Sequence, residues 1–190
     1  KALEVWDQGF AELLQRDDLW KGILIGQQEL AQGLISARTL VDAVNTSWGL
    51  SYIGGFLELP QMKEQVKGKE QLFLSSSLQS LESYGRFLRE GGRERVANGE
   101  DVFYGEVWTV GREAVQIASL LEPAVAEKLK AELSRYSRRW SLNRGQKTEY
   151  MHEFIGIVTS ALEPLVSDET KQELAGMMEE RQEEQSEKKE

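Results

Sequence analysis

The sequence contains no cysteine, which excludes disulfide bonds, thiolate metal sites and cysteine nucleophiles. It holds a single histidine, His152, so a triad of serine, histidine and acid would have to use that residue. No apolar run approaches the ~20 residues that a membrane-spanning helix needs, so we expect no transmembrane segment. Phosphate-binding and dinucleotide-binding glycine motifs are also absent from the sequence.

Basic residues are outnumbered, and the formal net charge is −9. Proteins that bind nucleic acid draw much of their affinity from clustered Lys and Arg, so we expect no nucleic-acid partner. The chain opens with KALEVW, without Met or a basic leader, and no signal peptide is predicted. This start suggests a processed protein or a fragment of a longer one.

Apolar residues recur at helical spacing in the N-terminal half. We predict a short helix around residues 3–13, a second from Leu19 to about Asn45, and a third from Pro60 to Arg89. The third carries four leucines in phase, Leu74, Leu78, Leu81 and Leu88. Two stretches rich in glycine, residues 48–60 and 91–101, are predicted to be connections.

One phrase occurs twice, as LLEPAVAEKLKAEL at residues 120–133 and ALEPLVSDETKQEL at residues 161–174. Each copy places a proline where one apolar stripe ends and the next begins, which is typical of the first turn of a new helix. Both copies therefore predict a helix, a sharp joint and a second helix. Internal duplication and chance resemblance between charged helices explain the similarity of the two stretches equally well.

These patterns predict an all-α bundle of about six helices with essentially no sheet. We expect one domain over residues 1–190, with the C-terminal half folded as two successive helical hairpins. Its predicted parts are N-terminal helices at 1–90, a loop at 91–103, paired hairpins at 104–178 and a charged tail at 179–190.

Glu149 and His152 have the Glu-x-x-His spacing of a half-site in di-metal carboxylate bundles. On a helical projection, however, the apolar face formed by Tyr150, Met151 and their neighbours leaves Glu149 nearly opposite and His152 well to one side. A metal site in a bundle core needs ligands that point inward. The two residues are weak metal candidates, and a solvated histidine is the favoured interpretation.

The segment RYSRRWSLNRGQK at 135–147 combines Arg135, Arg138 and Arg139 with the aromatic residue Trp140. Interleaved basic and aromatic residues can bind phosphates, stacked bases or acidic headgroups. Cations also stabilise the C-terminal end of a helix, where carbonyl groups lack partners. We favour this structural role. If the protein has an anionic partner, we expect that partner to bind at this segment.

Gly22 and Gly26 lie four residues apart in the second predicted helix. Glycine within a helix costs about 1 kcal/mol relative to alanine, so these residues call for a reason. We expect close packing, within the fold or against a partner helix.

Trp48, Tyr52 and Phe56 fall in the predicted glycine-rich connection, whereas most of the other tryptophans follow apolar stripes. Aromatic side chains on a connection can line a pocket or anchor a partner. A loop folded over the end of a bundle is an equally good interpretation.

No catalytic constellation emerges, and we expect a non-enzymatic protein without a cofactor. The leading hypothesis is an interaction or assembly subunit with a protein partner or self-association. The alternative is a helical sensory domain that binds a small molecule between helices, and a carboxylate-bridged metal protein is third.

Overall fold

The computed structural model describes residues 12–13, 15–57, 59–92, 100–139, 141–142 and 146–187, with side chains at all but 56, 91, 92 and 100–102. These residues form eight α-helices and no strand, so the all-α prediction is confirmed and the count of about six is too low. The helices are α2 (Leu19–Ser36), α3 (Leu40–Leu57), α4 (Pro60–Val66), α5 (Glu70–Phe87), α7 (Glu100–Leu121), α8 (Pro123–Ser137), α9 (Gln146–Leu162) and α10 (Asp168–Glu187). A π-helical turn, Leu88–Gly92, follows α5, and a 3₁₀ turn, Glu163–Leu165, precedes α10.

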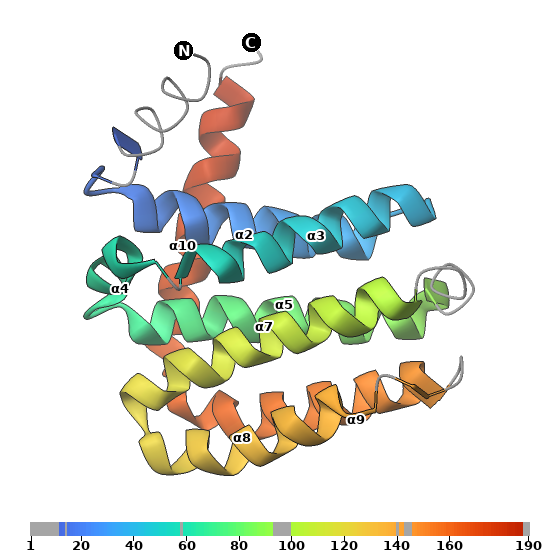
Figure 1. Cartoon of the computed structure of the whole chain (residues 1–190). Helices are drawn as coiled ribbons and strands as arrows, with labels where there is room; N and C mark the ends of the chain where they lie inside the picture. Colours follow the sequence, from blue (N-terminus) through green and yellow to red (C-terminus); the bar gives the residue numbers. More distant parts are fainter. Residues whose placement is uncertain are drawn as a thin grey trace, which may run out of the picture.

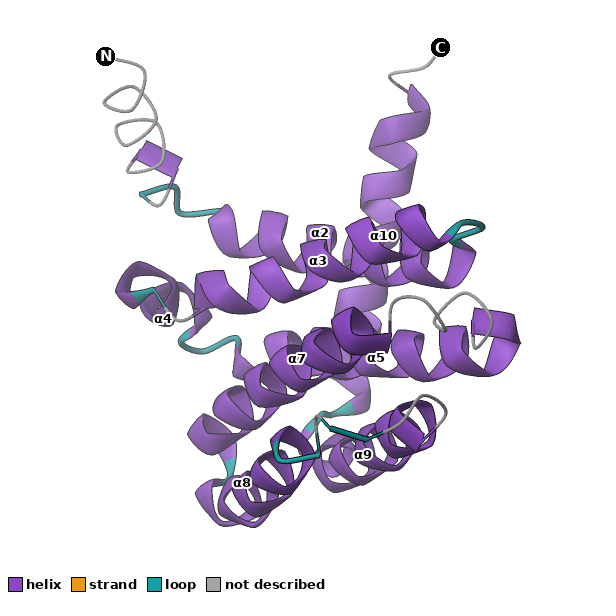
Figure 2. Ribbon diagram, turned by 45° about the vertical axis from the view of Figure 1, so that its right-hand side comes forward, coloured by secondary structure: helices purple, strands orange, loops and turns teal. Residues whose placement is uncertain are grey.

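Three helix pairs are stacked in layers (Figure 1). The first layer contains α2 and α3, the second α5 and α7, and the third α8 and α9, and each layer packs on the next. Figure 2 shows α10 running across the layers, and its main contacts are with α5 and α2. Helix α5 therefore lies at the centre, in contact with α2, α7, α9 and α10.

The second predicted helix is two helices, α2 and α3, and the stretch predicted to be a connection at 48–60 lies largely within α3. Thr39 starts α3 because its hydroxyl oxygen accepts a hydrogen bond from the backbone N–H of Asp42, at 3.1 Å. Gly49 serves packing rather than turning, because a Cβ there would stand 2.9 Å from a methyl carbon of Leu30 on α2. Absence of a side chain at Gly49 lets α3 approach α2.

The third predicted helix is also divided, into α4 and α5. Gly68 separates them with φ of 78°, a left-handed conformation that favours glycine. The four leucines predicted to share a face are all buried, namely Leu74, Leu78, Leu81 and Leu88. The apolar stripe was correctly predicted, although the break within the segment was not.

The joint at Pro123 separates α7 from α8 as predicted, and these two helices pack together. The second hairpin differs from the prediction. After the turn that contains Pro164, α10 leaves the direction of α9 and packs on α5 and α2.

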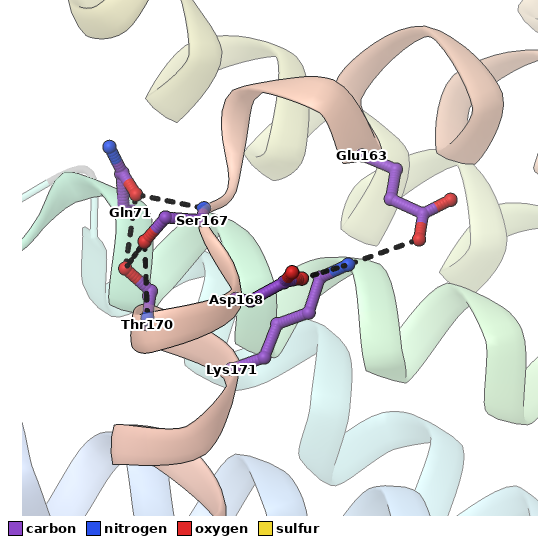
Figure 3. Close-up of polar contacts among 6 residues, drawn as sticks. All are labelled: Gln71, Glu163, Ser167, Asp168, Thr170 and Lys171. Atoms are coloured by element: carbon purple, nitrogen blue, oxygen red, sulfur yellow. Dashed lines mark hydrogen bonds and ion pairs between the residues drawn. The ribbon is translucent and has the colours of Figure 1, made fainter.

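Polar contacts fix the start of α10 (Figure 3). The hydroxyl oxygen of Ser167 accepts a hydrogen bond from the backbone N–H of Thr170, at 3.1 Å, as an N-cap does. Gln71 on α5 accepts hydrogen bonds through Oε1 from the backbone N–H of Ser167, at 3.1 Å, and from the hydroxyl of Thr170, at 3.0 Å. Lys171 pairs with Glu163 at 3.1 Å. These contacts tie the first turn of α10 to α5.

The predicted charged tail is largely the last part of α10, which extends to Glu187. Glu180 pairs with Lys21 at 3.2 Å, and Arg181 lies 3.6 Å from Glu29, so this part of the helix contacts α2. Residues 188–190 lie outside the described part of the chain, as do residues 93–99 of the predicted loop.

Gly111 of α7 packs against the buried ring of Phe154 on α9, and a Cβ there would stand 2.7 Å from ring carbons. We expect Gly111→Ala to lower the free energy of unfolding by about 1–3 kcal/mol, because the ring is enclosed and cannot move aside. Urea denaturation measures the change. Gly156→Ala on α9 is the matched control, because no described atom lies within 4 Å of its Cβ position. That control should be stabilising by about 0.5–1 kcal/mol, and a loss of stability in both variants alike would contradict the role of Gly111 in packing.

Candidate functional site

A buried polar layer crosses the interface of α2, α5 and α7. Gln27 and Gln28 on α2, Ser76 and Ser77 on α5, and Glu113 on α7 are all buried. Ser76 donates a hydrogen bond to Oε1 of Gln27 at 2.7 Å, and Gln28 donates to the hydroxyl oxygen of Ser76 at 2.8 Å. Buried polar groups need such partners because they have lost their hydrogen bonds to water.

Glu113 is the charged end of this layer. Its Oε1 accepts hydrogen bonds from the hydroxyl of Ser77, at 2.9 Å, and from the amide of Gln27, at 3.2 Å. Its Oε2 is equally buried and has no hydrogen-bond partner. On the α3 side Gly54 faces this oxygen, and a Cβ on Gly54 would stand only 2.9 Å from it.

Burial raises the pKa of Glu113 to about 7, although the hydrogen bonds from Ser77 and Gln27 and the charge of Arg112 act in the opposite direction. Loss of hydration penalises the ionised carboxylate more than two neutral donors compensate. The side chain can therefore gain or lose a proton near neutral pH. A second carboxyl on α7, Glu106, also has a raised pKa because it is partly buried, with a hydrogen bond from Ser51 acting to lower it.

A cavity of about 870 Å³ adjoins Glu113. Its walls come from the end of α3, from α4, from the start of α5 and from the C-terminal half of α7. The apolar part of the wall consists of Leu57, Val66, Ile117 and Leu120. Its charged part consists of Lys63, Glu64, Lys67 and Glu70 together with Glu113. The volume lies within the range of ligand-binding cavities.

The exposed face of α3 carries the aromatic residues that the sequence singled out. Trp48 is 45% exposed, Tyr52 is 70% exposed, and Val41 on the same face is 67% exposed. Most large apolar side chains elsewhere in the described chain are buried or half-buried, so this concentration on one helix is unusual. The structure brings Trp48 and Tyr52 together on this face, while the side chain of Phe56 lies outside the described residues.

Gly22 and Gly26 do not serve close packing within the described part of the chain. No described atom lies within 4 Å of the Cβ position of either glycine, and packing against a partner helix stays a prediction. Both residues line a shallow depression between α2 and α10 instead. Glycines that do permit close approach are Gly49, Gly54 and Gly111.

The arginines at the end of α8 have structural partners. Arg135 pairs with Glu132 and Glu153, and Arg138 donates to the backbone carbonyl of Ser134 in the last turn of the helix, at 3.1 Å. Arg139 lies 4.4 Å from the ring centre of Tyr150. Of these contacts, only that of Arg138 is with a carbonyl at the end of the helix, which is the structural role that the sequence favoured. Trp140 lies outside the described residues.

The two weak metal candidates lie on α9, where Glu149 is exposed and His152 is half-buried. His152 is therefore less solvated than its helical position predicted. Across the described residues, no group of three or more His, Asp or Glu side chains is arranged to hold a metal ion.

The sequence pointed to neither Glu113 nor Gly54. Glu113 follows Arg112 in an amphipathic helix and resembles a solvated residue until α2 and α5 are placed against it. A signal does exist in hindsight, because Gln27, Gln28 and the SSS run at 75–77 are polar residues within two helices that also carry core leucines.

Comparison of the chain with protein-family models, with curated proteins and with solved structures finds no match. Within the described residues, no helix combines the length and the apolar character needed to span a bilayer.

Proposed function

We propose that the chain is a non-enzymatic interaction protein that binds a partner through the exposed face of α3. The observation that carries this proposal is the exposure of Val41, Trp48 and Tyr52 on one side of a single helix. Tryptophan and tyrosine are the residues that most often dominate the energy of protein interfaces. Among the described residues, neither Trp48 nor Tyr52 belongs to the hydrophobic core, and the exposed part of each side chain can contact a partner.

The spacing of this face favours a helix as the partner element. The exposed positions along this stripe are Val41, Asn45, Trp48, Tyr52 and Gly55, which follow one another by alternating steps of four and three, and the exposed Asp42 of α3 lies to one side of it. This is the spacing of a helix-packing seam, and it extends over about 21 Å at about 1.5 Å per residue. None of the five positions is charged, as is typical of the centre of an interface.

We infer that the partner element is an amphipathic helix of another protein, with neutral or basic residues beside its apolar stripe. The net charge of −9 disfavours a second copy of the same chain and favours a partner of opposite charge. Self-association is therefore the outcome that would contradict this choice of partner.

A second candidate function is recognition of a small molecule between helices. A separate observation favours it, namely a cavity lined in part by Glu113, whose buried Oε2 has no hydrogen-bond partner. The two functions use different surfaces of the protein and can be tested separately.

Site-specific photo-cross-linking tests the α3 surface. A benzophenone amino acid replaces Tyr52 in cells that naturally make the protein, and the same group replaces the exposed Lys128 of α8 as a control. We expect one cross-linked partner from position 52 that is lost in the Trp48→Ser background and absent from position 128. Mass spectrometry identifies the cross-linked segment, which we expect to be an amphipathic helix.

The synthetic segment then provides the quantitative measurement. Its affinity for the purified protein should fall at least tenfold in Trp48→Ala, about 1.4 kcal/mol or more, as expected for an interface anchor. Equal cross-linking from positions 52 and 128, or cross-links only between copies of the chain, would contradict the proposal.

A further inference from the structure

Glu113 is the one carboxylate among the described residues that is almost wholly buried, at 2% exposed. Its two oxygens have different surroundings. Oε1 is satisfied by Ser77 and Gln27, whereas Oε2 has no donor. A buried carboxylate oxygen without a donor is costly, and native proteins seldom retain one without a compensating role.

The free oxygen belongs to a residue that lines the cavity of about 870 Å³. Leu57, Ile117 and Leu120 provide apolar wall on the same cavity. Gly54 of α3 packs beside Oε2, where a Cβ would stand 2.9 Å from this oxygen. The structure therefore places the side chain of Glu113 on the wall of a roomy, largely apolar space, which is the usual composition of a small-molecule site, while Oε2 itself is buried.

The charges of the wall indicate which ligands are compatible. Three carboxylates, Glu64, Glu70 and Glu113, face two ammonium groups, Lys63 and Lys67, so the fully ionised wall has a charge of 2 − 3 = −1. An anionic ligand would place its charge beside a buried acid and would be disfavoured. A cationic donor supplies the hydrogen bond that Oε2 lacks and the counter-charge that a buried carboxylate requires.

We propose that this cavity binds an amphiphilic amine, with its apolar body against Leu57, Ile117 and Leu120 and its ammonium group paired with the carboxyl of Glu113, whose buried Oε2 becomes accessible when the side chain turns toward the cavity. The inference rests on the second candidate function and is independent of the α3 surface. It assigns a ligand class to the cavity and a role to the one oxygen of the polar layer that lacks a partner.

The groups that surround Glu113 define how binding depends on pH. Gln27 on α2, Gly54 on α3 and Ser77 on α5 are uncharged, and Arg112 on α7 is the cation that acts on the carboxyl from its own helix. The charged groups of α4 and α5 on the cavity wall are Lys63, Glu64, Lys67 and Glu70. Amine binding selects ionised Glu113, so it should release protons near neutral pH and strengthen as the pH rises through about 7.

Three compounds of one shape provide the test, namely 1-aminoadamantane, 1-adamantanol and adamantane-1-carboxylate. Isothermal titration calorimetry at pH 8 measures their binding to the full chain. We expect the amine to bind at least tenfold more tightly than the alcohol, and the carboxylate to bind most weakly. In Glu113→Gln the amine should lose at least tenfold in affinity, while affinity for the alcohol should change less than twofold.

Two control variants distinguish recognition by Glu113 from a general effect of charge or of a distant surface. Glu64→Gln removes a carboxylate from the same wall without altering the buried layer and should change amine affinity less than threefold. Trp48→Ser alters the α3 surface and should leave amine binding unchanged. An equal loss in Glu64→Gln and Glu113→Gln would reduce the effect to net charge and overturn the proposal.

Proton release provides a readout that does not depend on a variant. Titrations at pH 6.5 in two buffers of different ionisation enthalpy should show proton release when the amine binds the unmodified protein, and the alcohol should show none. Equal affinity for amine and alcohol, without proton release, would overturn ammonium recognition and leave the cavity as a ligand site. Failure of all three compounds to bind would overturn the ligand site as well.

Discussion

The unmodified protein should lose about 2–3 kcal/mol of unfolding free energy between pH 5 and pH 8, and Glu113→Gln should abolish most of that loss. The reason is the pKa of Glu113, which burial raises to about 7 from an ordinary value of 4.5. A difference of one pKa unit corresponds to about 1.4 kcal/mol between the two protonation states. Urea denaturation at several pH values measures the effect.

The sign follows from which state of the protein holds the proton. Between pH 4.5 and about 7 the folded protein binds a proton at Glu113, and the unfolded chain does not. The resulting stabilisation is complete below the unfolded pKa and disappears as the pH rises through the folded pKa. Stability should therefore decline toward alkaline pH, because the ionised form must remain buried in the layer formed with Gln27 and Ser77.

Glu64→Gln is the matched control for this prediction, because Glu64 is exposed on α4 and should leave the pH profile nearly unchanged. Glu106 also has a pKa raised by burial, but it is present in both proteins and cancels from the comparison. Parallel pH profiles for the unmodified protein and Glu113→Gln would show that this carboxyl does not titrate in the folded state near neutral pH.

Local pattern was sufficient to predict the all-α class and part of the core. The leucine stripe of α5 and the joint at Pro123 were both predicted, because helical periodicity and the missing N–H of proline are properties of the segment itself. The path of α10 was not predictable in this way. It depends on Gln71 of α5, which is far from Ser167 in the sequence and holds the first turn of the helix.

Glycine misled the prediction at α3 for a related reason. By helix propensity alone, Gly49 and Gly54 destabilise a helix, and they therefore predict a connection. In the structure they permit contact with Leu30 of α2 and Glu113 of α7, and this tertiary packing offsets the unfavourable propensity. Trp48 and Tyr52 were correctly selected as unusual, but on the face of a helix rather than on a loop.

The polar layer shows the limit of sequence reasoning most clearly. A glutamate, two glutamines and a run of serines are ordinary residues on three separate amphipathic helices. They form a polar layer only when α2, α5 and α7 pack together, because Ser77 and Gln27 then both donate hydrogen bonds to Glu113. The same helix packing leaves Oε2 buried without a donor in a residue that lines a cavity, and no local motif marks this atom.

Tyr136→Ala should cause the largest loss of stability, about 3–5 kcal/mol of unfolding free energy, as expected when a large aromatic side chain is removed from a core. Tyr136 is fully buried, and its ring stacks on Tyr104 at 4.0 Å and on Phe154 at 4.2 Å between ring centres. Its hydroxyl donates to the backbone carbonyl of Tyr104 at 3.1 Å, and the hydroxyl of Tyr104 donates to the carbonyl of Tyr136 at 2.6 Å. The pair therefore joins α7 to α8 and contacts α9.

Tyr52→Ala makes the same chemical change at a side chain that is 70% exposed, so it should alter stability by less than about 0.5 kcal/mol. Tyr136→Phe retains the stacked ring and loses one hydrogen bond, and it should cost about 1 kcal/mol even if the alanine variant is too unstable to measure. Urea denaturation of the three variants distinguishes ring packing from hydrogen bonding. Similar losses for Tyr136→Ala and Tyr52→Ala would mean that α7, α8 and α9 do not share this aromatic core, and a loss in Tyr136→Phe as large as in Tyr136→Ala would assign its stability to the hydroxyl rather than to the ring.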